Sequence, residues 1–248
     1  MKRAACVAVG LALLGGVASA GEQVTFKSGT AEMGAYLAKP EGKGPFPAVI
    51  VIQEWWGLND WIKQQADALA REGYLALAPD LYRGKVTSDP KEAHQLMSGL
   101  SEDRALADLK AAYDHLRSLD AVRKDRIGVI GWCMGGRYAL RLAVEQPALA
   151  AAVAYYGAPP TDAAAIARIK APVLGNFGAE DKGPAPETVR EFEAAMKKAG
   201  KSVDVKIYPG AGHAFANVNN PWGGYRKEAA EDAWSRTLAF FGRHLKKA

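Results

Sequence analysis

The chain has 248 residues and a formal net charge of +5, from 32 lysine and arginine and 27 aspartate and glutamate side chains. No run of basic residues is interleaved with aromatic side chains, so we expect no nucleic-acid partner. The length fits one large domain, and the chain contains only two cysteines, Cys6 and Cys133.

The start of the chain has the pattern of a secretory signal peptide. Lys2 and Arg3 are followed by an apolar run over residues 4–17 and by the small-x-small cleavage sequence ASA. The run is shorter than the roughly 18 residues that span a bilayer, so we expect no stable membrane anchor. We therefore expect residues 1–20 to be a signal peptide, residues 21–248 to be one domain, and the protein to be periplasmic or secreted.

Cys133 is the single thiol of the expected mature chain, because Cys6 lies in the predicted signal peptide. A single cysteine cannot form an internal disulfide. It therefore indicates either a reactive thiol or a partner in an intermolecular bond.

Strand-like and helix-like segments alternate along the mature chain. Residues 47–53 form a continuous run rich in β-branched side chains, which is typical of a strand covered on both faces. Residues 60–73 carry apolar side chains at helical spacing and end on a glycine. In chain order we expect a hairpin at 22–28 and 32–39, strands at 47–53, 74–80, 126–131, 150–157, 172–178 and 203–209, and helices at 60–73, 103–119, 136–146, 187–200 and near the C-terminus.

This alternation predicts an α/β fold with a mostly parallel central sheet and helices on both faces. In such sheets, sites form beyond the carboxyl ends of the strands. Four chemically useful side chains come just after predicted strands: Glu54, Cys133, Asp181 and His213. We therefore expect these side chains to meet at one edge of the sheet.

Cys133 lies in the sequence GWCMG, which has the form G-x-S-x-G with cysteine in place of serine. This motif is a nucleophile elbow, in which Gly131 and Gly135 let a strand and a helix approach closely around a sharp turn. The N-terminus of the following helix points at the thiol and favours the thiolate. The alternative is a small buried cysteine without a chemical role, which is common. The strand before it and the helix after it favour the nucleophile.

His213 is the best candidate for the base that a cysteine nucleophile needs. It follows a strand in the turn PGAGHAF, whereas the other three histidines lie in a polar connection, inside a helix and among basic residues near the C-terminus. Asp181 is the natural partner of its second ring nitrogen, and the chain order nucleophile, acid, histidine is that of α/β-hydrolases. Glu180 is adjacent to Asp181, and the sequence favours Asp181 only slightly.

Glu54 follows seven mostly apolar residues and precedes WWG, so we expect its carboxylate to be only partly hydrated. It either takes the proton of the thiol or influences which partner does. The alternative is an exposed loop acid at the end of a strand.

The motifs QEWWG, APDLY, GWCMGG, GAEDKGPAP and GAGHAF resemble those of the dienelactone hydrolase family, the carboxymethylenebutenolidases of the α/β-hydrolase fold. The similarity runs from about residue 24 to the C-terminal helix. The resemblance implies a catalytic triad of Cys133, Asp181 and His213. It also implies that Glu54 contacts the thiol in the resting enzyme.

Further site residues follow from the same resemblance. The oxyanion hole maps to the backbone N–H groups of Trp55 and Met134. Family members that act on dienelactone hold the substrate carboxylate with arginines, and Arg83 matches one of these. The position of another, soon after the histidine, is Asn217 in this chain. The signal peptide is a second departure, since the well-known members are cytoplasmic.

We expect a cysteine-dependent hydrolase of small esters or lactones that forms a thioester intermediate and needs no metal or organic cofactor. The alternatives are a general exported esterase or thioesterase, and a non-catalytic binding module that keeps the fold. A redox role for the thiol is a third alternative, weakened by the lack of a second cysteine. The sequence leaves the substrate, the oligomeric state and the pathway open.

We expect the pocket under two loops, residues 83–103 and 216–226. Trp56, Tyr82 and Trp222 are candidate lining residues, and ordinary packing is the alternative for each of them.

Signal cleavage after Ala20 should give a mature protein that begins at Gly21, because the basic start, the apolar run and ASA together form a processing site. N-terminal sequencing of the protein from its native compartment measures this. A cytoplasmic protein that still begins at Met1 would refute the predicted export.

Overall fold

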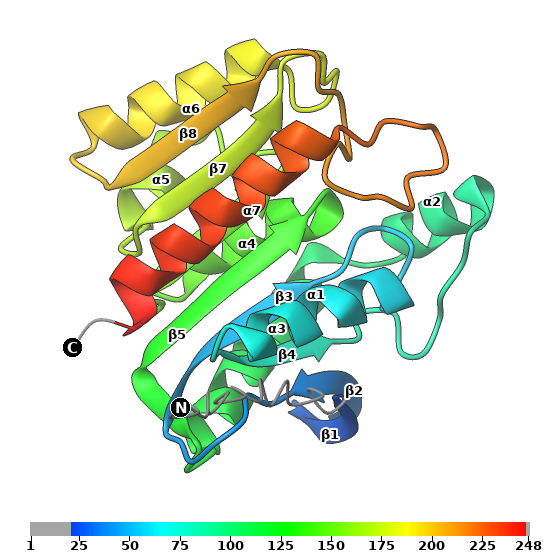
Figure 1. The fold of residues 1–248 in the computed structure, drawn as a ribbon, viewed down its shortest axis with the longest axis vertical. Coiled ribbons are helices and arrows are strands. Elements are labelled where there is room, and N and C mark those ends of the chain that lie inside the picture. Colours follow the sequence, from blue (N-terminus) through cyan, green and yellow to red (C-terminus); the bar gives the residue numbers. More distant parts are fainter. Residues whose placement is uncertain (1–20, 247–248) are drawn as a thin grey trace, which may run out of the picture.

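A twisted eight-stranded sheet forms the centre of the computed structural model, which describes residues 21–246 (Figure 1). The strands lie in the order β1-β2-β4-β3-β5-β6-β7-β8. The pairs β1–β2 and β2–β4 are antiparallel, and all other neighbours are parallel. The strands are β1 (Glu22–Ser28), β2 (Ala31–Ala38), β3 (Phe46–Ile52), β4 (Leu75–Pro79), β5 (Val122–Trp132), β6 (Ala151–Tyr155), β7 (Val173–Gly178) and β8 (Val203–Tyr208).

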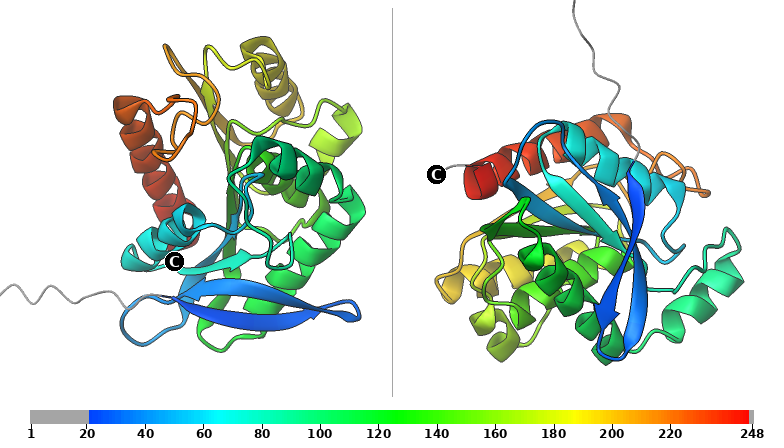
Figure 2. Two further views of the ribbon diagram at one scale, coloured as in Figure 1. Left: turned by 90° about the vertical axis from the view of Figure 1, so that its right-hand side faces the viewer. Right: turned by 90° about the horizontal axis from the view of Figure 1, so that it is seen from below.

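Helices cover both faces of the sheet, as Figure 2 shows with the sheet seen edge-on. Helices α3, α4, α5 and α6 pack on one face, and α1 and α7 pack on the other. Helix α2 lies beyond the carboxyl ends of the strands. The helices are α1 (Asp60–Arg71), α2 (Pro90–Ser98), α3 (Glu102–Ser118), α4 (Met134–Glu145), α5 (Ala163–Arg168), α6 (Pro186–Lys198) and α7 (Lys227–Phe241), followed by the π-helical turn η1 (Gly242–Lys246).

Strand β3 illustrates why the central strands are apolar throughout. Ile50 and Ile52 point into the core under α3 and α4, whereas Val49 and Val51 point into the core under α1 and α7. Each of the four side chains is fully buried. A strand covered on both faces has no position left for a polar side chain, which explains the continuous β-branched run in the sequence.

The architecture confirms the predicted α/β-hydrolase fold with its mostly parallel sheet. The predicted signal peptide lies outside the described residues, as do residues 247–248. Within the part of the chain that the structure describes, no helix is long and apolar enough to cross a membrane.

Helix α2 interrupts the segment 83–103, which the sequence analysis treats as a loop. It begins with Asp89 as N-cap, whose carboxylate accepts the Lys91 N–H at 2.8 Å, and with Pro90 in the first turn. It buries only Ala93 fully, so its apolar stripe is too weak to stand out in the sequence. The helix places Met97 beside the site described next.

Candidate active site

Cys133 lies at the junction of β5 and α4, in the sharp turn that the sequence predicts. Its backbone has a φ of 53°, which a residue with a side chain rarely adopts. A Cβ atom at Gly131 would collide with the carbonyl of Gly135, and a Cβ atom at Gly135 would collide with the carbonyl of Ile52. The two glycines therefore let α4 start directly against β5 and β3.

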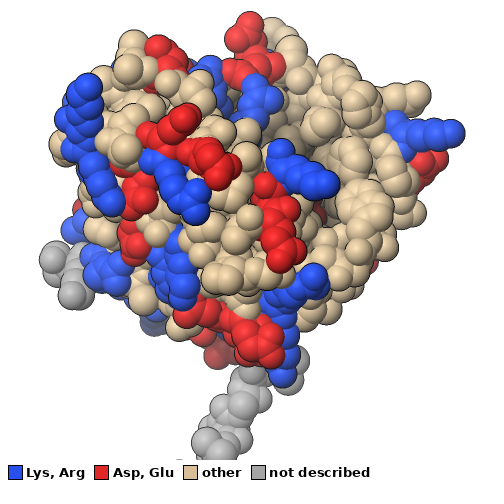
Figure 3. All heavy atoms as spheres, turned by 90° about the horizontal axis from the view of Figure 1, so that it is seen from above, with Lys and Arg blue, Asp and Glu red and all other residues tan. Residues whose placement is uncertain are grey.

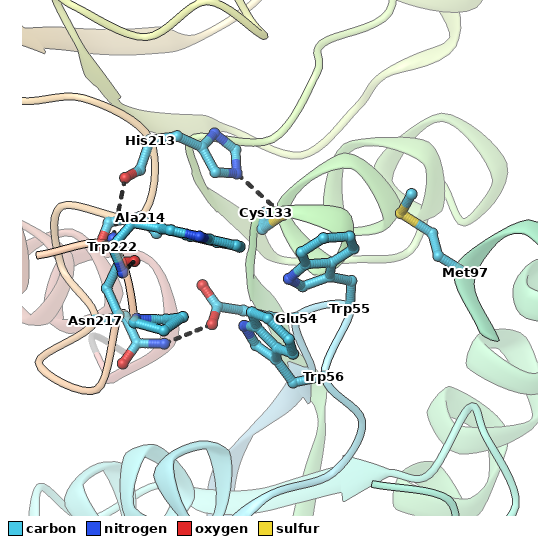
Figure 4. A pocket seen from close by; sticks show the side chains of 11 residues that line it. Glu54, Trp55, Trp56, Met97, Cys133, His213, Ala214, Asn217 and Trp222 are labelled. Atoms are coloured by element: carbon cyan, nitrogen blue, oxygen red, sulfur yellow. Dashed lines mark hydrogen bonds between the residues drawn. The ribbon is translucent and has the colours of Figure 1, made fainter. Parts of the chain in front are cut away.

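His213 and Asp181 form a chain of hydrogen bonds that begins at the thiol. Figure 4 shows its first link, from Cys133 to His213. Nε2 of His213 lies 3.1 Å from Sγ of Cys133, and Nδ1 lies 2.9 Å from Oδ2 of Asp181. Asp181 is buried, and its Oδ1 accepts a hydrogen bond of 2.9 Å from the Gly183 N–H. The adjacent Glu180 is exposed. The structure thus places Asp181, and not Glu180, against the imidazole.

Electrostatics in this chain favour a protonated His213. Burial lowers the pKa of His213, but the hydrogen bonds with Asp181 and Cys133 and the negative charges of both groups outweigh burial and raise it to about 10. As an imidazolium, the ring carries a proton on both nitrogens. It can then donate to Asp181 on one side and to Cys133 on the other.

Glu54 lies next to this chain at the end of β3 and is buried, with 2% of its surface exposed. Its Oε2 accepts a hydrogen bond of 2.6 Å from the Asn217 side chain, and its Oε1 accepts one of 3.4 Å from the Tyr156 hydroxyl. Burial raises the pKa of Glu54 to about 7, although the Asn217 hydrogen bond, the charge of His213 and the Tyr156 hydrogen bond each lower it.

Among residues 21–246 no hydrogen bond joins the Glu54 carboxylate to Sγ of Cys133, although both side chains line the same cavity. The reason is competition for partners. Asn217 and Tyr156 hold the two carboxylate oxygens, while His213 holds the thiol.

A cavity of about 220 Å³ opens in front of Cys133, between the loop 216–226 and helix α2. Trp56 and Trp222 line this cavity, as the sequence predicts, and the side chain of Trp55 joins them. Its lining is Glu54, Trp55, Trp56, Met97, Cys133, His213, Ala214, Asn217, Asn220, Pro221 and Trp222. A second cavity, of about 250 Å³, also reaches Cys133 and contains Arg137 and Glu102.

Arg83 does not line either cavity at Cys133, so its expected role as a substrate clamp does not fit the structure. Its guanidinium lies 2.7 Å from Oδ1 of Asp108, a buried carboxylate that also accepts a hydrogen bond from Ser28. Tyr82 and Arg83 line a separate cavity of about 460 Å³. The Tyr82 hydroxyl is 3.3 Å from the sulfur of Met134, so Tyr82 packs behind the elbow instead of against the thiol.

The predicted oxyanion donors both belong to segments at Cys133: Met134 follows it directly, and Trp55 lines the same cavity. Met134 is the first residue of α4, so its N–H has no acceptor within the helix. Trp55 follows Glu54 directly after β3 and lines the cavity at Cys133. Two backbone N–H groups at such positions can face a carbonyl oxygen bound at the thiol.

Tyr156 is a site residue that the sequence analysis missed. It follows β6 directly, has a φ of 38° and is fully buried against Glu54. The sequence predicts a strand over 150–157, which includes Tyr156, whereas β6 ends at Tyr155, so the rule for residues after strand ends passes over it. Among residues 21–246, no group of three or more His, Cys, Asp or Glu side chains is arranged to hold a metal ion.

Comparison with known proteins places this chain in a family. The dienelactone hydrolase family model matches residues 33–245. A protein of Saccharolobus solfataricus named "Putative carboxymethylenebutenolidase" is 37% identical over 261 residues, covering 90% of this chain and 98% of the relative. A Bradyrhizobium protein named "Probable 2-oxo-3-(5-oxofuran-2-ylidene)propanoate lactonase" is 36% identical, covering 85% of this chain and 89% of the relative.

The fold of this chain is also similar to a solved structure, that of the "Dienelactone Hydrolase-like" promiscuous phosphotriesterase P91 from metagenomic libraries. The TM-score is 0.83 and the sequence identity is 27%. The match covers 90% of this chain and 98% of the solved chain.

Replacing Arg83 by methionine should lower stability, because it leaves the buried Asp108 carboxylate without its cation. The free energy of unfolding should fall by about 2 kcal/mol in urea titrations. Converting Asp108 to asparagine in the same chain should recover most of this loss, since a neutral amide needs no cation. The exposed Arg190→Met is the control and should change stability by less than about 0.5 kcal/mol. If Arg83→Met left stability unchanged and lowered activity only on acidic substrates, Arg83 would be a substrate-binding residue instead.

Replacing Glu54 by glutamine should stabilise the fold at about pH 8 but not at about pH 4. The pKa of Glu54 rises from 4.5 to about 7 on folding, so the folded chain binds this proton more tightly than the unfolded chain. In the wild-type protein, the stability that the protonated Glu54 contributes is fully present below pH 4.5 and is lost as the pH rises to about 7. The glutamine variant avoids that loss, roughly 3 kcal/mol.

Urea titrations at both pH values measure the difference between the two proteins. The folded pKa of His213, about 10, lies above both pH values, so its own titration contributes nearly equally to the two proteins. The exposed Glu191→Gln is the control and should show no pH-dependent gain. A Glu54→Gln gain of equal size at both pH values would mean that Glu54 does not titrate in this window.

Proposed function

The chain belongs to the dienelactone hydrolase family, and from that membership we propose that it hydrolyses small esters or lactones with Cys133 as the nucleophile. The observation that carries the proposal is the hydrogen-bonded chain from Sγ through both ring nitrogens of His213 to Asp181, with spacings of 3.1 and 2.9 Å. A nucleophile, a base and an orienting acid at these distances have the geometry that nucleophilic catalysis needs.

The first half of the reaction makes a thioester. The reaction starts with the proton on Nε2 of His213 and the negative charge on Sγ of Cys133, a pair that Asp181 stabilises from the far side. The thiolate attacks the carbonyl carbon, and the N–H groups of Trp55 and Met134 bind the oxyanion that forms. When the C–O bond breaks, His213 gives its Nε2 proton to the departing alkoxide. The alcohol leaves, or stays attached if the substrate is a lactone.

The second half returns the enzyme to its starting state. Neutral His213 takes a proton from water, and the resulting hydroxide attacks the thioester carbon. The C–S bond breaks and Cys133 leaves as a thiolate beside the imidazolium. The carboxylic acid product is released, so each cycle consumes one water and one ester bond.

Glu54 acts in this scheme through charge. It is close enough to His213 for the imidazolium to lower the pKa of Glu54, so an ionised Glu54 in turn favours the imidazolium. Asn217 keeps the carboxylate in place with a hydrogen bond of 2.6 Å. We propose this role in place of a resting Glu54–thiol contact.

The signal-peptide pattern of residues 1–20 further supports an exported hydrolase.

Turnover of p-nitrophenyl acetate tests the proposal. Cys133→Ala should lower kcat by about 10⁴-fold or more, because the nucleophile and the base act as a unit. His213→Gln should fall similarly. His94→Gln, on the exposed surface of α2, is the matched control and should keep wild-type turnover.

Rapid acid quenching during turnover should trap one acetyl group on Cys133, seen by peptide mass mapping. Wild-type turnover by Cys133→Ala would refute the nucleophile. A protein that binds esters but hydrolyses none would be a binding module.

A further inference from the structure

The cavity on one side of Cys133 has a wall of three tryptophan rings. The ring centroids of Trp55 and Trp56 lie 4.8 Å apart, and that of Trp222 lies 6.0 and 5.6 Å from them. Trp55 and Trp56 follow β3, whereas Trp222 comes from the loop after His213, so two distant segments build one aromatic surface (Figure 4). Tilted rings at these distances pack favourably on one another and on a further ring.

The position of Trp222 is fixed by its own loop, although 60% of the residue is exposed. The side-chain oxygen of Asn220 accepts a hydrogen bond from the backbone N–H of Trp222 at 3.0 Å, and its side-chain nitrogen donates one to the carbonyl of His213 at 3.4 Å. The loop is therefore tied to the residue that contacts the thiol. Together with Trp55 and Trp56 the exposed ring forms a contiguous aromatic surface at the cavity, which is typical of a ligand-binding site.

The charge of the cavity points to an uncharged ligand. Among the described residues no lysine or arginine lines it, and its one acid besides the reacting pair is Glu54. A carboxylate placed there would lose its water and lie near Glu54. The cation in the lining, His213, is already paired with Asp181 and Cys133. A dry apolar cavity of about 150 Å³ holds benzene, so about 220 Å³ is enough for a substituted ring.

The surface around the entrance is also apolar. Val86 and Val218 are 51% and 61% exposed, and both lie on loops that border Trp56. The loop of Val86 is tied to Trp56 by the Thr87 N–H, which donates to the Trp56 carbonyl at 3.0 Å. In Figure 3, uncharged side chains prevail on the right, where Figure 1 has the loop 216–226 and α2.

The opposite side of the thiol is different. The cavity of about 250 Å³ there contains Arg137 in an ion pair with Glu102, which also pairs with Arg141. Both cavities include Cys133, His213 and Met97, so they meet at the reacting atoms. An ester bound at Cys133 therefore lies in a site with one apolar end and one polar end.

We propose that the tryptophan wall selects esters or lactones that carry an uncharged, flat, benzene-sized ring on that side of the scissile bond, and that Trp222 determines this specificity. The inference rests on the proposed hydrolase function. It excludes a carboxylate from the ring side and leaves the Arg137 side for the more polar end of the substrate.

Two alkyl acetates of similar reactivity test the ring preference: ethyl acetate and 2-phenylethyl acetate. Burial of the ring should raise kcat/KM for the phenyl compound roughly 10- to 100-fold over ethyl acetate. Trp222→Ala should lower this ratio by about tenfold, while Trp222→Phe should keep most of it. A carboxylate at the para position of the ring should remove the advantage.

Val218→Ala is the matched control, because Val218 is equally exposed on the same loop but does not line the cavity at the thiol. It should leave the ratio unchanged. A wild-type ratio near one, or an equal ratio in Trp222→Ala, would overturn the proposal.

Binding separates this proposal from the hydrolase proposal. The ketones 5-phenyl-2-pentanone and 2-pentanone replace the ester oxygen by a methylene and cannot be hydrolysed. In Cys133→Ala, calorimetry should show roughly tenfold or more tighter binding of the phenyl ketone, and Trp222→Ala in the same background should lower this preference by about tenfold. A preserved preference without ester turnover would refute only the hydrolase function. Turnover with no preference would refute only the ring site.

Discussion

The strained backbone at Cys133 is the constraint on which the site depends. A residue with a side chain at a sparsely populated φ costs about 1–3 kcal/mol, so the surroundings must hold it there. The Cys133 N–H donates to the carbonyl of Tyr155 at 3.0 Å, and the Cys133 carbonyl accepts from the Arg137 N–H at 3.2 Å. Strand β6 and helix α4 thus fix the turn from both sides. This conformation brings Sγ of Cys133 within hydrogen-bonding distance of His213, which lies in the segment that follows β8.

Charge balance follows from this placement. Asp181 is buried on one side of His213, and the thiol is partly buried on the other, so one imidazolium serves two potential anions. A third buried anion, Glu54, has no cation of its own. Burial therefore raises the pKa of Glu54 to about 7, and the neutral donors Asn217 and Tyr156 compensate only in part. The site thus contains one ion pair, between His213 and Asp181, and a titratable neighbour, Glu54. Hydrogen-bond donors stand beside Glu54 where a second positive charge would otherwise be needed.

Residues that belong to a local backbone pattern could be predicted from the sequence, and residues that depend on competition between partners could not. Cys133, His213 and Asp181 follow strands, and strand ends converge whatever the side chains do. The contacts of Glu54 depend on Asn217, more than 160 positions away, and nothing local announces that hydrogen bond. Arg83 also follows a strand end, but a buried carboxylate on α3 is the stronger partner for its guanidinium.

The segment QEWWG shows how closely the chemical and the binding parts of the site are linked. Gln53 accepts the Leu81 N–H at 3.3 Å, Glu54 lies in the proton network, and Trp55 and Trp56 form most of the aromatic wall. Glu54 itself lines the tryptophan-walled cavity. On the proposal of a ring site, a bound ring removes the remaining water from this carboxylate, and burial is the effect that already raises its pKa. Filling the cavity and protonating Glu54 are then coupled, so the same side chain opposes an anionic ring and favours a neutral one.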